Sequence, residues 1–210
     1  MAKLLILRGF SPLVWTLGIL VLSRVDRLVL AKFEGPEVVA VYALGVTLSE
    51  IVRMFPTAFS QFVTREMALG ASGKVILNYI LLSCASAIVV GVISVPSSYF
   101  LVGRALDPVY LEAIPLLAVL LVGEVAMALY LSAARGLQGL GDASSTARIG
   151  AIAAVLALPF YALGANFFGG IGVAAVLASC YVILGVASAV LLRARLRRTQ
   201  PLGESSELGV

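Results

Sequence analysis

Six long apolar stretches dominate the sequence, and short segments of charged residues, glycine and proline separate them. Stretches of about 17 to 26 largely apolar residues are typical of transmembrane α-helices, whereas the strands of a β-barrel alternate over roughly ten residues. The pattern therefore predicts an all-α integral membrane protein with a six-transmembrane-helix bundle. The expected spans are residues 12–33, 38–63, 75–95, 112–134, 149–165 and 171–192.

The polar segments between the spans predict the loops. Glycine and proline break helices, and carboxylates at these positions favour water. Pro96 is expected to end the third helix, and Pro56 is expected to kink the second. Turns or loops are expected at residues 34–37, 65–74, 96–111, 135–148 and 166–170. The segment 96–111 is expected to be an interfacial loop or a short surface helix, and the segment 135–148 is expected to carry the ends of its two helices as well.

The composition agrees with a membrane protein. Of 210 residues, 61% are hydrophobic and 12% are charged, which is far too apolar for a soluble globular domain. The net charge of +4 is concentrated at the ends of the spans, so it indicates contact with lipid headgroups and no nucleic-acid partner. There is no histidine and no serine or cysteine set beside a base, and Cys84 and Cys180 lie far apart inside spans. We therefore expect no enzyme, no metal site and no cofactor.

Basic residues are distributed unevenly between the two ends of the predicted helices. Six spans put both termini on one side, which receives ten lysine and arginine residues, whereas the other side receives only Lys32 and Arg104. Cytoplasmic loops carry an excess of lysine and arginine. Both termini are therefore expected to be cytoplasmic, with residues 1–11 as a lead-in and residues 193–210 as a basic anchor and disordered tail.

The first span carries three charged residues beyond its middle: Arg24, Asp26 and Arg27. Its twelve Leu, Ile, Val and Phe residues favour insertion by about 0.3–0.6 kcal/mol each, whereas each charge opposes insertion by about 2.5–3.5 kcal/mol. The span therefore needs neighbours that present polar groups or water. Intramembrane charge of this kind usually marks a substrate or ion path. Alternatively, Asp26 neutralises one arginine and the other arginine extends to the membrane surface.

Two other spans carry charge at a similar depth. Glu50 and Arg53 lie in the second span, and Glu124 lies in the fourth. At a rise of about 1.5 Å per residue, these side chains, with Arg24 and Asp26, lie about 15 to 21 Å from the cytoplasmic end, near the middle of the hydrocarbon core. This layer predicts either a shared hydrated cavity or a salt-bridge network that joins the helices. The fifth and sixth spans are rich in glycine and alanine, which indicates close helix packing, so no chemistry is assigned to them.

Two blocks of the sequence resemble the second half of the polysaccharide flippases, which export O-antigen and capsule repeat units and belong to the multidrug, oligosaccharidyl-lipid and polysaccharide exporter superfamily. Residues 23–56 are similar to the family's helix with a buried aspartate, its FxG turn and its next helix. Residues 110–142 are similar to its Y-x-x-A-x-x-x-L and L-x-G-x-G patterns, and residues 170–175 to G-x-x-G-A-A. The matching positions in the two blocks are Asp26, Phe33, Gly35, Tyr42, Pro56, Tyr110, Ala113, Leu117, Leu137, Gly139 and Gly141.

The resemblance implies a multi-pass protein of the bacterial or archaeal inner membrane that moves undecaprenyl-pyrophosphate-linked sugars for polysaccharide or lipopolysaccharide biosynthesis. Such transporters have twelve to fourteen helices in two similar halves with the cavity between them, whereas this chain supplies six predicted helices. It is therefore expected to be a half that pairs with a second half or with itself, or a fragment of a longer polypeptide. The asparagine-rich fifth helix of the family is replaced here by alanine and Pro159.

The leading hypothesis is a flippase half in which Arg24, Arg27 and Arg53 contact the pyrophosphate-sugar headgroup, because the planar guanidinium fork suits phosphate oxygens. The carboxylates that would balance the cavity charge, or couple transport to a proton or sodium ion, are Asp26, Glu50 and Glu124. One alternative is a half-size ion-coupled drug or cation antiporter that dimerises around its glutamates, although three midplane arginines argue against a cationic substrate. A second alternative is a non-transporting membrane scaffold subunit.

Overall fold

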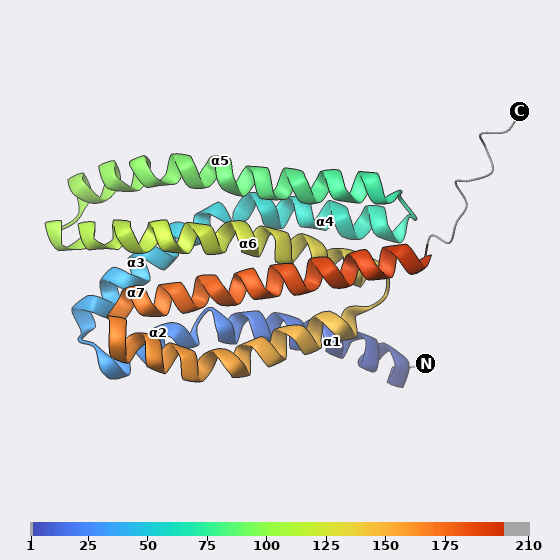
Figure 1. Ribbon diagram of the computed structural model, residues 1–210, viewed down its shortest axis with the longest axis horizontal. Helices are drawn as coiled ribbons and strands as arrows, with labels where there is room; N and C mark the ends of the chain where they lie inside the picture. Colours follow the sequence, from blue (N-terminus) through green and yellow to red (C-terminus); the bar gives the residue numbers. More distant parts are fainter. Residues whose placement is uncertain (1, 200–210) are drawn as a thin grey trace, which may run out of the picture.

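The computed structural model describes residues 2–199, and every regular element among them is a helix (Figure 1). The predicted disordered tail, from residue 200 onward, lies outside the described residues. The elements are α1 (Ala2–Leu22), α2 (Val25–Phe33), α3 (Pro36–Val52), α4 (Met54–Ala68), α5 (Gly73–Ala105), the 3-10 helix η1 (Pro108–Glu112), α6 (Ala113–Gly139) and α7 (Ala143–Thr199).

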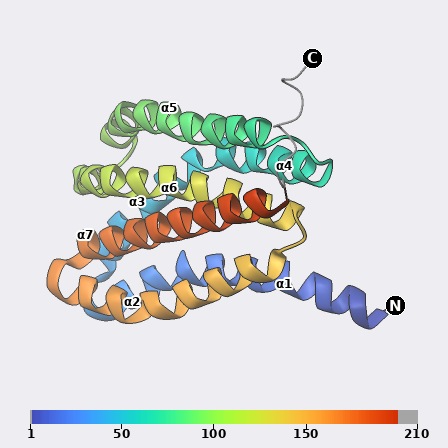
Figure 2. The same ribbon diagram turned by 45° about the vertical axis from the view of Figure 1, so that its right-hand side comes forward.

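The long helix α7 reverses direction at Gly169 and forms two legs that lie side by side (Figures 1 and 2). Gly169 has φ +57° and ψ −141°, a backbone conformation that glycine adopts far more readily than other residues. The reversal falls inside the turn predicted at residues 166–170. The two legs approach closely, because a Cβ atom at Gly164 would lie 2.9 Å from the carbonyl oxygen of Gly172. Glycines therefore provide both the turn and the close packing beside it.

Several helices are long and apolar enough to cross a membrane, which indicates a membrane protein. They are α5, η1 with α6, and α7, and the bent pair of α3 and α4 adds a fourth if it is one span. Large apolar side chains on their surfaces are widely exposed, including Val92 at 69% and Phe168 at 75%. Such surfaces suit lipid rather than water. The arrangement of six spans with cytoplasmic termini remains a prediction.

Helix α6 lies at the centre of the bundle (Figures 1 and 2). It packs against α3, α4, α5 and α7, while α1 and α2 pack against α7. In the most apolar 18-residue segment of η1 and α6, 50% of the residues are buried. In the corresponding segment of α5, which lies at the edge of the bundle, 22% are buried. The start of α1, the α4–α5 and α6–α7 turns and the end of α7 lie at one end of the bundle (Figure 1).

The two expectations about proline have different outcomes. Helix α5 continues through Pro96 to Ala105, so Pro96 does not end the third helix. A helix that is buried or surrounded by lipid retains its remaining hydrogen bonds because no water competes for them. The second helix is bent by 43° between Val52 and Met54, one turn before Pro56, so the kink predicted from Pro56 is confirmed. Pro56 has no N–H group to donate to the carbonyl oxygen of Val52, four residues earlier, and its ring would clash with that carbonyl group in a straight helix.

Other helix bounds also differ from the sequence-based expectation. The first predicted span starts earlier, at Ala2, and is divided into α1 and α2. Residues 135–148, expected to be a loop that also carries the ends of its two helices, contain a turn of only residues 140–142, because α6 continues to Gly139 and α7 begins at Ala143. Gly141, with φ +82°, makes this tight turn. Hydropathy marks only the apolar part of a helix, so polar residues in the end turns were assigned to loops.

Candidate functional site

A break between α1 and α2 positions Arg24 between two helix segments. The helical hydrogen bonding of α1 ends where the Ser23 amide donates to the carbonyl oxygen of Ile19 at 3.0 Å. The carbonyl oxygen of Leu22 accepts a 2.8 Å hydrogen bond from the hydroxyl group of Tyr161 in α7. A backbone carbonyl group released inside a membrane needs such a partner. A side chain from a distant part of the sequence therefore stabilises the break.

The bend between α3 and α4 lies at Arg53. Its backbone amide donates to the carbonyl oxygen of Glu50 at 3.1 Å, and its own carbonyl oxygen accepts from the hydroxyl group and the amide of Thr57 at 2.8 and 3.0 Å. Both discontinuities thus have an arginine at the break. In membrane transporters, discontinuous helices of this kind commonly form the substrate or ion site.

Arg53 forms the shortest ion pair among the described residues. Its Nε atom donates to Glu124 Oε2 at 2.9 Å, and its Nη2 atom donates to Glu124 Oε1 at 2.5 Å. Nη2 also donates to the hydroxyl group of Tyr181 at 3.2 Å, and the guanidinium carbon lies 5.3 Å from the centre of that ring. Glu124 is only 2% exposed. The pair therefore joins α4, α6 and α7, as the salt-bridge hypothesis predicts for this part of the layer.

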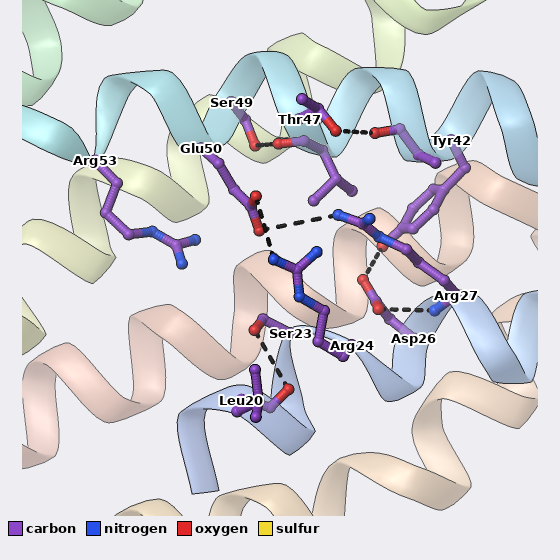
Figure 3. A network of polar contacts seen from close by, with 12 residues as sticks. Leu20, Ser23, Arg24, Asp26, Arg27, Tyr42, Thr47, Ser49, Glu50 and Arg53 are labelled. Atoms are coloured by element: carbon purple, nitrogen blue, oxygen red, sulfur yellow. Dashed lines mark hydrogen bonds and ion pairs between the residues drawn. The ribbon is translucent and has the colours of Figure 1, made fainter. Parts of the chain in front are cut away.

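Glu50 faces two arginines at once (Figure 3). Its carboxylate oxygens lie 3.8 Å from Nη2 of Arg24 and 3.9 Å from Nη2 of Arg27. These distances allow ion pairing but are too long for hydrogen bonds. The Nε and Nη2 atoms of Arg27 are buried and have no hydrogen-bond partner among the described residues. The Glu50 carboxylate thus partly neutralises two guanidinium groups and accepts no hydrogen bond from either of them.

Asp26 lies apart from this pairing although it belongs to the same helix segment (Figure 3). It is fully buried, and its Oδ2 atom accepts a 2.7 Å hydrogen bond from the hydroxyl group of Tyr42. Its Oδ1 atom accepts from the backbone amide of Arg27, also at 2.7 Å. Among the described residues, no arginine lies within ion-pair distance of Asp26. The neighbouring arginines turn toward Glu50, so the alternative in which Asp26 neutralises one of them is not what the structure shows.

A cavity of about 450 Å³ opens beside the charged layer. Of the predicted site residues, Arg24, Glu50 and Arg53 line it, whereas Asp26, Arg27 and Glu124 do not. The full lining consists of Trp15, Thr16, Ile19, Leu20, Ser23, Arg24, Glu50, Arg53 and Arg135. Three arginines and a single carboxylate therefore border this space. The layer is partly a cavity and partly an ion-pair network.

Arg135 is a cavity residue that the sequence analysis missed, because it was counted among the charges of a cytoplasmic loop. It lies in the last turn but one of α6, where its guanidinium carbon is 5.1 Å from the centre of the Trp15 ring. One signal was available in the sequence: Arg135 follows Glu124 by eleven residues, which is close to three helical turns and places both on one face. This argument requires the helix to continue beyond residue 134, where the predicted span ended.

The fifth and sixth predicted spans also contribute to the site, although no chemistry was assigned to them. Tyr161 and Tyr181, one on each leg of α7, bond to Leu22 and Arg53 respectively. Both tyrosines are buried. The glycine and alanine pattern indicates the close packing correctly. It does not indicate that the hydroxyl groups of Tyr161 and Tyr181 form hydrogen bonds with other helices. Cys84 and Cys180 are free thiols that are partly buried, outside the cavity.

Comparisons with known proteins give no match for this chain, whether with protein-family models, with curated proteins or with solved structures.

Proposed function

We propose that the chain is one half of a flippase that moves undecaprenyl-pyrophosphate-linked sugar units across the inner membrane of a bacterium or archaeon. The observation that carries this proposal is the excess of cations in the cavity: Arg24 and Arg135 line it with Glu50 as the one carboxylate, while the third arginine of the lining, Arg53, is paired with Glu124. Uncompensated charge is strongly disfavoured inside a membrane. An anionic headgroup would supply the missing charge, while the lipid chains of the substrate stay in the bilayer.

The proposal includes six membrane spans with both termini in the cytoplasm. α1 with α2, α3 with α4, α5, α6 and the two legs of α7 would be these spans. The turns at residues 69–72 and 140–142 and the end of α7 adjoin the basic residues expected on the cytoplasmic side, including Arg65, Lys74 and Arg148. The opposite end holds few basic residues, as cytoplasmic termini require.

A second half would cover the cavity. The Arg24 side chain is 50% exposed and that of Glu50 is 26% exposed, although both lie within the proposed spans. Contact of these charges with hydrocarbon would destabilise an isolated unit by several kcal/mol. We therefore propose that the chain pairs with another six-helix unit, either a second copy or the other half of a longer transporter. Crosslinking in native membranes tests this pairing.

The roles of the charged residues differ within the proposed mechanism. Among the predicted headgroup contacts, Arg24 has the most exposed side chain. Arg53 is bound by Glu124, so its role is to hold together the helices that form the cavity wall. Arg27 supports Glu50 from outside the cavity. Asp26 has a tyrosine hydroxyl donor and no ion-pair partner among the described residues, so it is the carboxylate best suited to couple transport to a proton. An antiporter centred on Glu50 and Glu124 is less well supported, because both face arginines.

A reconstituted transport assay tests the function. The protein is incorporated into proteoliposomes with a fluorescent polyisoprenyl-diphosphate oligosaccharide, and the label exposed on the outer leaflet is measured by chemical quenching over time. Transport is expected when the paired unit is present, and a cationic dye in the same vesicles should not move. If the chain is monomeric in lipid, with no partner half, and moves no substrate, the scaffold alternative is supported and the flippase proposal is rejected.

A further inference from the structure

The cation best prepared to bind an anion in the cavity is Arg135. Its guanidinium carbon lies over the Trp15 ring, 5.1 Å from the ring centre, and the Trp15 indole nitrogen donates a 2.7 Å hydrogen bond to the hydroxyl group of Tyr130. The ring is therefore fixed in place and is only 5% exposed. A cation over an aromatic face is attracted by the ring without using its N–H groups as donors to a carboxylate. Trp15 thus acts as a platform that holds Arg135 in position.

Few acceptors among the described residues engage Arg135. Its Nη1 atom lies 3.4 Å from Oε1 of Gln138, which is a long hydrogen bond, and its Nε atom is buried without a partner. No carboxylate among the described residues forms an ion pair with it. Arg53, by contrast, uses both sides of its guanidinium fork on Glu124 and Tyr181. Of the three arginines that line the cavity, Arg53 is therefore the least available to a ligand.

Arg24 and Arg135 belong to different helices but line the same cavity. Arg24 is at the break between α1 and α2, and Arg135 is near the end of α6 that adjoins the α6–α7 turn. Glu50 is the one carboxylate in the lining, and it is already shared between Arg24 and Arg27. The positive charge of Arg24 and Arg135 in the lining therefore exceeds the negative charge that Glu50 supplies. An anion with several oxygens on adjacent phosphorus atoms can accept hydrogen bonds from two separate guanidinium groups.

We propose that Arg135, held on Trp15, and Arg24 together form a binding site for a diphosphate group in this cavity, with Arg53 as a positioning residue. The proposal deepens the proposed function and rests on it for the biological source of the anion. It changes the headgroup contacts expected from the sequence, because Arg135 is added and Arg53 is removed. The same chemistry describes a free diphosphate and the headgroup of a diphosphate lipid.

Trp15 is itself the probe for the experiment, because it is the single tryptophan of the chain. Its fluorescence is measured in the full-length protein in lipid nanodiscs during titration with inorganic pyrophosphate. We expect a saturable change in emission. Arg135→Gln and Arg24→Gln should each weaken binding about tenfold or more, since each removes a charge-assisted contact. Arg135→Lys should bind with intermediate strength because it keeps the charge without the fork.

Arg104 provides a matched control. Its guanidinium carbon lies 4.5 Å from the centre of the Phe100 ring, so it is also an arginine stacked on an aromatic side chain, but it is remote from the cavity. Arg104→Gln should bind pyrophosphate like the unmodified protein. The site is overturned if pyrophosphate leaves Trp15 emission of the unmodified protein unchanged, or if Arg104→Gln weakens binding as much as Arg135→Gln does. The first of these outcomes does not depend on the folding of any variant.

A second arm separates the two sources of the diphosphate. Nanodiscs are prepared with or without a polyisoprenyl diphosphate, and pyrophosphate is titrated into both. Weaker apparent pyrophosphate binding in the lipid-containing discs assigns the site to a lipid headgroup, whereas equal binding assigns it to a soluble diphosphate. Binding that persists in a protein without transport activity would reject the flippase function and keep the diphosphate site, so the two failures can be distinguished.

Discussion

The hydroxyl group of Tyr161 donates a 2.8 Å hydrogen bond to the carbonyl oxygen of Leu22, at the residue where α1 ends. The two residues are 139 positions apart in the sequence, and the contact is buried. It attaches the first leg of α7 to the break that positions Arg24. The geometry of the candidate site therefore depends on a tyrosine in a helix whose sequence pattern indicates packing alone.

Replacement of this tyrosine should destabilise the fold. Tyr161→Phe leaves the Leu22 carbonyl group buried without a donor, so we expect a loss of about 1–3 kcal/mol in the free energy of unfolding. Unfolding in mixed micelles with increasing denaturing detergent measures the change. Tyr99→Phe is the control, because Tyr99 is 61% exposed. Equal effects of both variants would show that the Tyr161 hydrogen bond contributes nothing specific.

The Arg53–Glu124 pair should behave as a buried ion pair. Glu124→Gln removes the carboxylate and leaves the Arg53 charge with poor compensation, so stability should fall by about 3–5 kcal/mol. The double variant Arg53→Met with Glu124→Leu removes both charges and should recover much of that loss. A double-mutant cycle in the same unfolding assay gives the coupling between the residues. A coupling near zero would contradict the structural role assigned to this pair.

Arg24 should affect transport more than stability. Its side chain is half exposed and its ion pair with Glu50 is long, so Arg24→Ala should leave the amount of protein in the membrane nearly unchanged. Transport in the proteoliposome assay should fall about tenfold or more, and Arg24→Lys should restore part of it. Arg104→Ala is the matched arginine control. Normal transport by Arg24→Ala would remove Arg24 from the proposed substrate path.

Asp142, in the turn between α6 and α7, should make stability depend on pH. Burial alone would raise the pKa of this carboxyl group, but hydrogen bonds from Ser145 and the charge of Arg195 at 2.8 Å hold the pKa below its ordinary value of 3.8. The folded-state pKa is thus lower than the unfolded one. The ionised group therefore stabilises the fold above about pH 4, and this stabilisation is lost as the pH falls through the folded-state pKa.

Two substitutions separate the charge of Asp142 from its capping role at the start of α7. Asp142→Asn keeps an acceptor for the Ser145 amide and removes the charge, so it should lower stability by up to about 1 kcal/mol at pH 7. Asp142→Ala also removes the cap and should lose about 1 kcal/mol more. In thermal unfolding, the difference between Asp142→Asn and the unmodified protein should shrink below pH 4. A difference that stays constant down to pH 2 would contradict the assigned role of the charge.

The proposed topology can be tested by cysteine labelling. Cys84 and Cys180 are first replaced by alanine, and single cysteines are then introduced at Ser72, in the α4–α5 turn, and at Ser206, beyond the described residues. A membrane-impermeant maleimide should label both only after the cytoplasmic side is made accessible. Leu106, beside η1 at the opposite end, is the control position for labelling from outside. Labelling of position 72 or 206 in intact cells would reverse the orientation or change the number of spans.

Hydropathy was sufficient for the class of fold and for most helix positions, because insertion into lipid depends on local apolar content. The turn at residues 166–170 could be predicted because glycine is needed where Gly169 takes positive φ. Helix ends were less predictable, since polar end turns such as those around Arg135 and Arg148 resemble loops. The bend at Arg53 could be predicted from Pro56, one turn later, whereas the break at Arg24 was not predicted because the partner that stabilises it, Tyr161, lies elsewhere in the chain.

The sequence by itself was enough to predict that the charges at the α1–α2 break, in α2, at the end of α3 and in α6 share one depth, because position along a helix converts directly into distance along its axis. Only the tertiary structure decided how these charges pair, because pairing depends on the rotation of each helix about its axis and on which neighbours it meets. Glu124 meets Arg53, Glu50 meets Arg24 and Arg27, and Asp26 meets Tyr42. The same rotation brings Arg135 to the cavity, where the sequence pattern alone placed a loop.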